Sequence, residues 1–180
     1  MVRCRRIVFE NFFSRMESGK EMKNQRMLDE LTELMRIDVS SGQETEIAEH
    51  LVKKLEQMGF AITRDEAGAT FGGVCGNILA VREGERDGVV CFCSHMDRVP
   101  GGIGIKPVEE DGILRSSGDT ILAADDLSGV AAILEGVRQA IESGKALPKL
   151  EILFTVGEEA GLYGAKAFDV SLLTSKTMYV

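Results

Sequence analysis

The stretch from Leu150 to Val156 constrains the fold more than any other part of the chain, because most of its residues are apolar. A strand with one face in water alternates apolar and polar side chains, whereas a strand that is buried on both faces is an almost continuous apolar run. This stretch therefore predicts a central β-strand that other parts of the chain cover on both faces.

Helical and extended segments alternate along the rest of the sequence. Apolar side chains recur at the helical period in the segments 26–37 and 128–143 and in a segment that ends at about residue 58, and a short helix is predicted at 161–169. Short apolar runs predict strands at 61–63, 77–81, 89–93 and 177–180, and the glycine-rich stretch 100–120 predicts a long loop or a hairpin. Strands that alternate with helices form a layered α/β domain, with the sheet between helices.

The sequence Ser41–Gly42–Gln43–Glu44 precedes the second predicted helix with the spacing of a capping box. In that motif the serine hydroxyl accepts a hydrogen bond from the amide of the glutamate, and the glutamate carboxylate reaches back to the serine amide. Both side chains are therefore expected to be used locally, at the start of the helix.

Charge and cysteine pattern limit the partners and the compartment. The net charge of −8 argues against a nucleic-acid surface, which needs clustered Lys and Arg. No apolar run approaches the roughly 20 residues that span a bilayer, so no membrane association is expected. The cysteines at 4, 75, 91 and 93 form no CxxC pair, and Cys91 and Cys93 face the same way on a predicted strand as small hydrophobes. A reducing, cytoplasmic location is expected.

The first of three polar clusters, Ser94–Asp97, directly follows the strand predicted at 89–93. A His and an Asp two residues apart on an extended segment point the same way. Asp97 could then orient the imidazole of His95 from behind while that imidazole binds a metal. The alternative is a histidine that hydrogen bonds satisfy at the end of a strand.

The second cluster, Asp125 and Asp126, stands just before the helix predicted at 128–143. Asp is favoured at such a position for capping and for the helix dipole, without any ligand. One Asp is enough for a cap, however, and a second carboxylate beside it costs repulsion unless a cation is present. A structural role and metal binding both stay open for this pair.

The third cluster, Glu158 and Glu159, follows the apolar run 150–156 between two glycines. Adjacent glutamates on a surface loop are usually only solvated. At the end of a buried strand they would project in different directions, so that one could hold a metal while the other meets the water on that metal. All three clusters stand at strand ends, where open α/β sheets bind their ligands.

In this order, the clusters resemble the signature of the co-catalytic zinc exopeptidases. The signature consists of His95–Met96–Asp97, Asp125–Asp126 with Gly129, and Glu158–Glu159 before Gly161 and Gly164–Ala165. The closer similarity is to peptidase T-like proteins, the tripeptide aminopeptidases, and it rests on the segments 104–107, 116–126 and 158–166.

The resemblance implies a role for each residue. His95, Asp125 and Glu159 would be ligands of two Zn²⁺ ions, with Co²⁺ or Mn²⁺ as alternatives, and Asp125 would bridge the pair. Asp97 would orient His95, and Glu158 would be the general base that takes a proton from the metal-activated water. The implied substrate is a short peptide, and the implied bond between Asp125 and the next residue is cis.

The sequence departs from the family pattern beside the first two clusters. Arg98 stands where family members usually have Thr, and Leu127 stands where they usually have Lys. Both replacements are expected to lie beside the metals, where they would alter substrate fit.

The resemblance also predicts the domain organisation. Residues 1–22 are expected to form a disordered leader, and residues 23–180 the N-terminal part of a three-layer α/β catalytic domain with a mostly parallel, mixed sheet. The family's lid and dimerisation domain and two further downstream ligands have no counterpart here, so the chain is expected to be C-terminally truncated. A homodimer is expected only of the full-length enzyme. His50, the other histidine, is expected to face solvent.

Three interpretations stay open from the sequence. The first is a metallo-aminopeptidase that removes residues from short peptides. The second is a catalytically inactive remnant of such an enzyme, with a partial metal site or none. The third is a related zinc hydrolase that acts on N-acyl amino acids.

Overall fold

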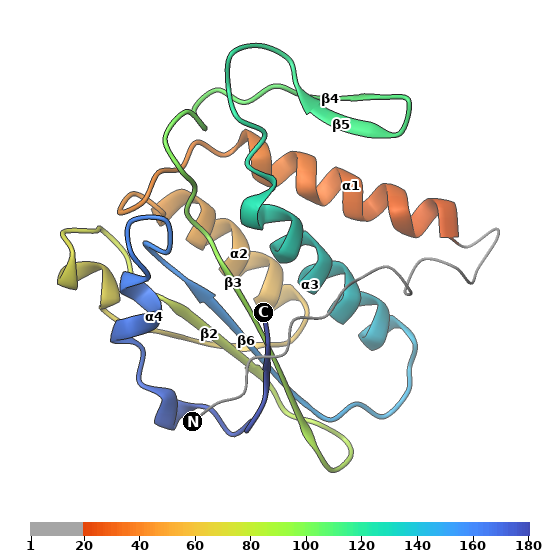
Figure 1. Ribbon diagram of the computed structural model, residues 1–180. Helices are drawn as coiled ribbons and strands as arrows, with labels where there is room; N and C mark the ends of the chain where they lie inside the picture. Colours follow the sequence, from red (N-terminus) through yellow and green to blue (C-terminus); the bar gives the residue numbers. More distant parts are fainter. Residues whose placement is uncertain (1–19) are drawn as a thin grey trace.

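A five-stranded sheet forms the centre of the molecule (Figure 1) in the computed structural model, which describes residues 20–180. The strands lie in the order β1-β2-β6-β3-β7. Their bounds are Ala61–Arg64 for β1, Ile78–Arg82 for β2, Val89–His95 for β3, Lys149–Thr155 for β6 and Met178–Tyr179 for β7. The predicted leader, residues 1–22, lies outside the described part except for its last residues, where the first helix begins.

The sheet is mixed, as predicted. Strand β2 pairs antiparallel with both β1 and β6, whereas β3 pairs parallel with both β6 and β7. It follows that β2 alone runs against the direction of the other strands. The prediction of an α/β fold with a mostly parallel, mixed sheet is therefore confirmed.

Strand β6 is the central strand that its apolar sequence predicts. Six of its seven residues are buried, and it lies between β2 and β3. Its parallel register with β3 places His95 opposite Thr155, so both strands end at the same edge of the sheet. The segments that follow the two strands are thereby brought close together.

Three helices enclose the main core on one face of the sheet; the second and third contact its strands, and the first packs against the third (Figure 1). They are α1 (Lys20–Arg36), α2 (Thr45–Gln57) and α3 (Ala124–Glu142). Each contributes an apolar stripe at the helical period, as in Leu51 and Leu55 of α2 and Val130 and Leu134 of α3, all of which are fully buried. The three long helices that the sequence predicts are confirmed.

The opposite face carries a smaller hydrophobic cluster. Leu79 and Leu153 of the sheet pack there against Phe168, which follows the short helix α4 (Tyr163–Ala167) and precedes the 3-10 turn η3 (Val170–Leu172). Cys93 packs against the same cluster, and Cys91 two residues earlier is buried. The two cysteines thus share a face, as the strand period requires.

A hairpin of β4 (Pro107–Glu110) and β5 (Ile113–Ser116) stands apart from the main sheet, above α1 (Figure 1). Its turn residues, Asp111 and Gly112, both have positive φ angles, of 54° and 73°. Two consecutive residues of this kind make the hairpin turn whose twist matches that of the strands. The turn predicted at Asp111–Gly112 is therefore confirmed.

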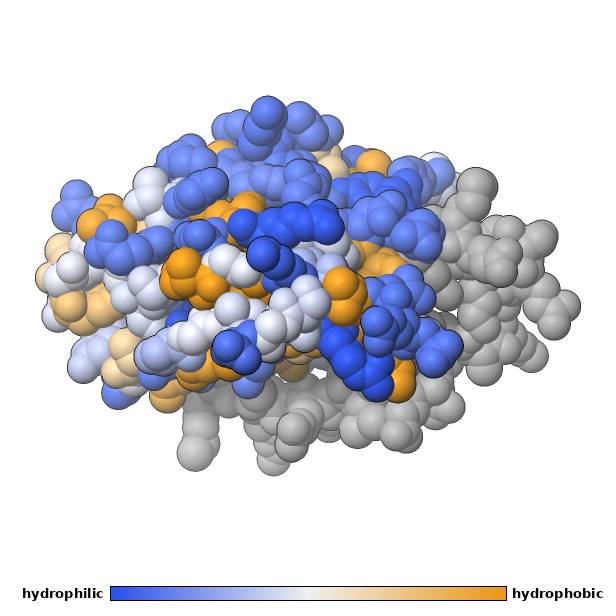
Figure 2. Space-filling view, turned by 90° about the horizontal axis from the view of Figure 1, so that it is seen from above, coloured by the Kyte–Doolittle hydropathy of each residue, from blue (hydrophilic) through white to orange (hydrophobic). Residues whose placement is uncertain are grey.

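The outer surface agrees with the acidic composition. Figure 2 shows mostly hydrophilic residues on the face seen from above, with hydrophobic residues scattered in small groups. None of the helices between residues 20 and 180 is long and apolar enough to cross a membrane.

The capping box predicted at Ser41 and Glu44 is wrong. The Ser41 hydroxyl donates to Oδ2 of Asp97 at 2.5 Å instead of accepting from an amide of α2. Oε1 of Glu44 accepts from the amide of Gly42 at 2.8 Å and from that of Gly157, 113 residues along the chain, at 3.0 Å. Ser41 thus binds a distant carboxylate, and Glu44 shares one oxygen between a nearby amide and a distant one.

The central position of β6 leads to a stability prediction. Phe154 of β6 is fully buried in the main core. Phe154→Ala should lower the free energy of unfolding by about 3–5 kcal/mol, because it removes buried apolar surface and leaves a cavity. Urea denaturation followed by circular dichroism measures the loss.

Ile113→Ala on the hairpin is the control, since that side chain is 50% exposed and should change the stability by less than about 0.5 kcal/mol. Equal losses for the two variants would contradict the placement of β6 at the centre of the core.

Candidate metal centre

His95 is the last residue of β3, and its imidazole lies between two carboxylates. Nε2 is 3.2 Å from Oδ1 of Asp125, and Nδ1 is 3.4 Å from Oδ1 of Asp97. Nδ1 also lies 3.1 Å from the main-chain oxygen of Asp97. The structure therefore brings together a histidine and an aspartate that stand 30 residues apart in the sequence.

The two aspartates at the start of α3 have separate roles. Oδ1 of Asp126 accepts from the amide of Gly129 at 3.1 Å, which is a helix cap, and Oδ2 accepts from the Ser94 hydroxyl at 2.7 Å. Asp125 makes no such cap; its side chain is 85% exposed and its carboxylate faces His95. The peptide bond between them is cis. One carboxylate thus serves the helix and the other is available to the site.

Asp97 connects His95 to the loop that follows β6. This carboxylate is fully buried, and it accepts from the amides of Glu158 at 2.9 Å and Glu159 at 3.1 Å as well as from the Ser41 hydroxyl. Burial alone would raise the pKa of Asp97, but hydrogen bonds from His95, Ser41 and the two amides outweigh it and lower the pKa. Asp97 is therefore held as a charged carboxylate behind the imidazole.

The side chains of Glu158 and Glu159 lie beside His95. One ligand atom from each of these three residues lies within 4.8 Å of the others, a spacing that a single metal ion can bridge. Burial raises the pKa of Glu159, and repulsion from Asp125, Glu158 and Asp97 adds to this effect against the attraction of His95. The site thus gathers more negative charge than its one imidazole can balance.

The donor set fits a divalent metal. Burial alone would lower the pKa of His95, but hydrogen bonds to Asp97 and Asp125 and the nearby Glu158 raise it to about 9, so a cation is favoured at this point. One imidazole nitrogen with several carboxylate oxygens is a set that Zn²⁺ and similar ions accept. Among the described residues, His95, Glu158 and Glu159 have ligand atoms at metal-binding spacing. Asp125 contacts Nε2 of His95, and Asp97 contacts the imidazole on its Nδ1 side.

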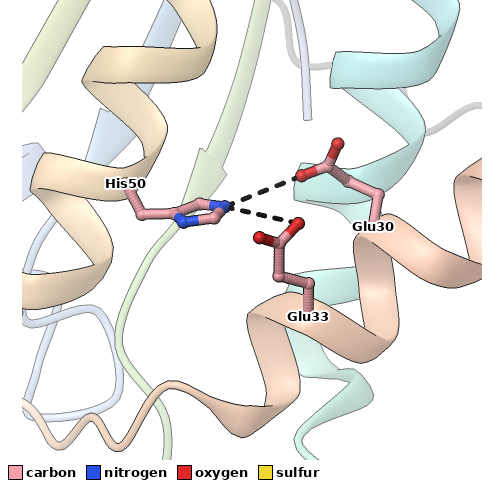
Figure 3. Close-up of side chains that lie close together, drawn as sticks. All are labelled: Glu30, Glu33 and His50. Carbon is pink, nitrogen blue, oxygen red and sulfur yellow. Dashed lines mark ion pairs between the residues drawn. The ribbon is translucent and has the colours of Figure 1, made fainter.

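A second group with metal-ligand spacing lies between α1 and α2 and consists of Glu30, Glu33 and His50 (Figure 3). Here the protein supplies its own cations: Nζ of Lys54 is 3.0 Å from Glu30 and 2.8 Å from Glu33, and Arg138 is 2.9 Å from Glu30. An ammonium between the two carboxylates leaves no charge for a metal to balance, so this group is an interhelical ion pair network.

The same contacts correct the prediction for His50. Its side chain is 20% exposed, and Nε2 lies 3.8 Å from Glu30 and 3.9 Å from Glu33 (Figure 3). Instead of facing solvent, His50 points from α2 toward the acidic side chains of α1. The reason is that helix periodicity predicts which face is apolar but not which polar residue a neighbouring helix will meet.

Arg98 does not lie in the site, contrary to the prediction. Its guanidinium is buried and donates to main-chain oxygens of Leu34, Met35 and Ile37 at the end of α1, and of Gly102, at 2.8–3.3 Å. The last carbonyl groups of a helix have no partners within the helix, and a cation is favoured there by the helix dipole. Arg98 therefore fastens the end of α1 to the segment that follows β3.

Leu127, the other replacement, is fully buried in the main core. The prediction that it would shape the substrate site is therefore wrong. Its apolar side chain continues the stripe of α3 toward the sheet.

Glu44 and Ser41 contact the site from a loop that the sequence assigned to a helix cap. Glu44 is fully buried, and burial raises the pKa of its carboxyl, with the repulsion of Asp97 adding to the effect against its hydrogen bonds from amides. The sequence contains one sign of these two residues, the spacing of Ser41 and Glu44. That spacing is interpreted as a capping box at the start of a helix, so their contacts with the site were missed.

A sequence profile of Peptidase family M28 matches residues 77–179, a range that includes the three polar clusters. The protein YqjE of Bacillus subtilis (strain 168) is 37% identical over 159 residues, which cover 88% of this chain and 43% of YqjE.

Two solved structures show the same fold at comparable identity. Aminopeptidase PepT from Bacillus cereus superposes with a TM-score of 0.83 at 39% identity, over 86% of this chain and 42% of that one. A tripeptidase from Staphylococcus aureus superposes with a TM-score of 0.81 at 35% identity, over the same shares of the two chains. The chain thus spans less than half the length of these relatives.

The surroundings of His95 lead to a pH prediction. In the metal-free protein its imidazole should titrate near pH 9, well above the usual value of about 6.5. Since the folded state raises this pKa, the associated stability is fully present below about pH 6.5 and is lost as the pH rises toward 9. An NMR titration of the histidine ring signals in EDTA, with assignment from His95→Gln, measures the value.

A ring pKa for His95 at or below about 6.5 in the metal-free chain would contradict the placement of its imidazole between two carboxylates.

Proposed function

Since the chain belongs to Peptidase family M28, we propose that the protein hydrolyses short peptides as a metal-dependent aminopeptidase, with this chain contributing the residues around His95. One observation carries the proposal. His95, Asp125 and the Glu158–Glu159 pair come from three separate segments, at the ends of β3 and β6 and at the start of α3, and the carboxylates of the other two segments lie around the imidazole of His95.

The carboxylates around His95 mark the position where a cation would bind. His95, Asp125 and Glu159 would hold zinc, and bound zinc would supply Lewis acidity to the substrate carbonyl and to a water molecule. Asp97 keeps the imidazole in place through contacts to its Nδ1 side, so that Nε2 faces Asp125 and the site. In this orientation Nε2 would be the nitrogen that coordinates the ion.

In this proposal, Glu158 moves the proton. Its amide is fixed by Asp97 at 2.9 Å, while its carboxylate lies in the group that surrounds His95. It would take a proton as the water oxygen bonds to the carbonyl carbon, and pass that proton to the amine as the carbon–nitrogen bond breaks. The products are a free amino acid and a shortened peptide.

The two structural relatives favour this reaction over the hydrolysis of N-acyl amino acids. One is described as an aminopeptidase and the other as a tripeptidase, at 39% and 35% identity. Short peptides are therefore the proposed substrate class, and N-acetyl amino acids serve as the comparison in the assay.

The test is metal content and hydrolysis on the purified chain. With Zn²⁺ added, we expect at least one zinc per chain and release of an amino acid from a tripeptide, at a higher rate than deacylation of N-acetyl amino acids. Less than one zinc together with no release would support the inactive remnant instead. Zinc without release would contradict the hydrolytic role but leave the metal centre.

Glu158→Gln separates the proton-transfer role from metal binding. The variant keeps the shape of the side chain but cannot take a proton, so kcat for the tripeptide should fall by about 10²–10⁴-fold. Its zinc affinity should stay within about threefold of the unmodified chain, whereas Glu159→Gln should weaken zinc binding by about 10-fold or more. If Glu158→Gln weakened zinc binding and Glu159→Gln lowered only kcat, the two assigned roles would have to be exchanged.

A further inference from the structure

Three consecutive amides of the loop after β6 are bound by buried carboxylates. The Gly157 amide donates to Oε1 of Glu44 at 3.0 Å, the Glu158 amide to Oδ1 of Asp97 at 2.9 Å, and the Glu159 amide to Oδ2 of Asp97 at 3.1 Å. With the amides turned inward, the backbone of the loop is fixed from behind, while the glutamate side chains lie beside His95. Asp97 accounts for two of these bonds and Glu44 for the first.

Glu44 acts from inside the protein. The residue is fully buried, and the same oxygen that binds the Gly157 amide also accepts from the Gly42 amide at 2.8 Å. Its other oxygen, Oε2, is buried and accepts no hydrogen bond from the described residues. A side chain without solvent exposure cannot touch a substrate, so any influence of Glu44 on the site must pass through the backbone of the loop.

Ser41 extends the same support to Asp97. Its hydroxyl donates to Oδ2 of Asp97 at 2.5 Å, the oxygen that also binds the Glu159 amide. A short stretch between α1 and α2 therefore holds Gly157 directly through Glu44, and the next two residues indirectly through Ser41 and Asp97.

The loop can occupy this position only with glycine at its start. Gly157 has a φ of +60°, and a Cβ at this residue would lie 2.6 Å from Cζ of Phe71. Glycine alone adopts this backbone freely and leaves room for the aromatic ring. The carboxylate of Glu44 and the ring of Phe71 thus fix the first residue of the loop together.

We propose that Glu44 and Ser41 are positioning residues that hold the Glu158–Glu159 loop in the geometry needed to bind metal. The inference depends on one part of the proposed function, the role of Glu159 as a metal ligand. It assigns to the stretch between α1 and α2 an indirect role in the site, exerted through hydrogen bonds to Gly157 and Asp97.

The test compares Glu44→Ala with Glu44→Gln in the full chain. Glu44→Ala removes the acceptor of the Gly157 amide, so the hydrogen exchange of that amide, measured by NMR in the metal-free protein, should accelerate at least about tenfold. Zinc binding, measured by calorimetry with Zn²⁺ alone, should weaken by about 10–100-fold, the range typical of partners behind metal ligands. Glu44→Gln keeps an oxygen acceptor of the same length and should restore both properties to within about threefold of the unmodified chain.

Glu46→Ala is the matched control, because Glu46 is an exposed glutamate on the adjoining turn of α2 and should change neither property. If Glu44→Ala does not fold, Ser41→Ala tests the same support, since it removes one oxygen atom and should also weaken zinc binding. Unchanged Gly157 exchange and zinc affinity in a folded Glu44→Ala, unchanged affinity in Ser41→Ala, or a Glu44→Gln that behaves like Glu44→Ala would each overturn the proposal.

The amide exchange is read without metal and without substrate. A failed tripeptide assay would therefore contradict the proposed function alone, whereas unchanged exchange would contradict the positioning role alone.

Discussion

The parallel pairing of β3 and β6 is the constraint on which the rest of the site depends. Because the two strands run in the same direction and in register, with His95 opposite Thr155, their carboxyl ends stop at one edge of the sheet. The loop with Glu158 and Glu159 then begins beside the residue that follows His95. The start of α3 reaches the same edge, and with it Asp125. With another register, the segments that follow β3 and β6 would not lie side by side near the start of α3.

Electrostatics distinguishes the two acidic groups of the molecule. Around Glu30, the ammonium of Lys54 and the guanidinium of Arg138 lie at hydrogen-bonding distance. Burial alone would raise the pKa of Glu30, but interactions with His50, Arg138 and Lys54 lower it to about 2. Around His95, by contrast, the carboxylates repel one another and the imidazole is the one basic group among the contacts described. The first group is an ion-pair network in which Lys54 and Arg138 offset the acidic charge, while the carboxylates of the second outnumber its one basic side chain.

Buried polar side chains hold the site from behind. Asp97 links the imidazole to the loop after β6, Glu44 and Ser41 link that loop to the stretch between α1 and α2, and Arg98 fastens the end of α1 to the segment after β3. Asp97, Glu44 and Arg98 are buried, so losing one of these hydrogen bonds would leave a polar atom without a partner inside the protein.

The sequence by itself determined the elements and their order. Apolar periodicity placed the helices and the central strand, and glycine and aspartate placed the hairpin turn, because these signals lie within short segments. The ordered clusters indicated which side chains would meet through their resemblance to a known family. The tertiary structure decided the partners of Glu44, Arg98 and His50. Ser41 and Glu44 fit a local capping pattern, yet they bind Asp97 and Gly157 across the chain, and Arg98 points toward a helix end instead of the candidate site. A buried polar group forms hydrogen bonds with the atoms that packing of the core brings within about 3 Å, and many of these atoms are distant in the sequence. A pattern within a short segment therefore cannot predict them.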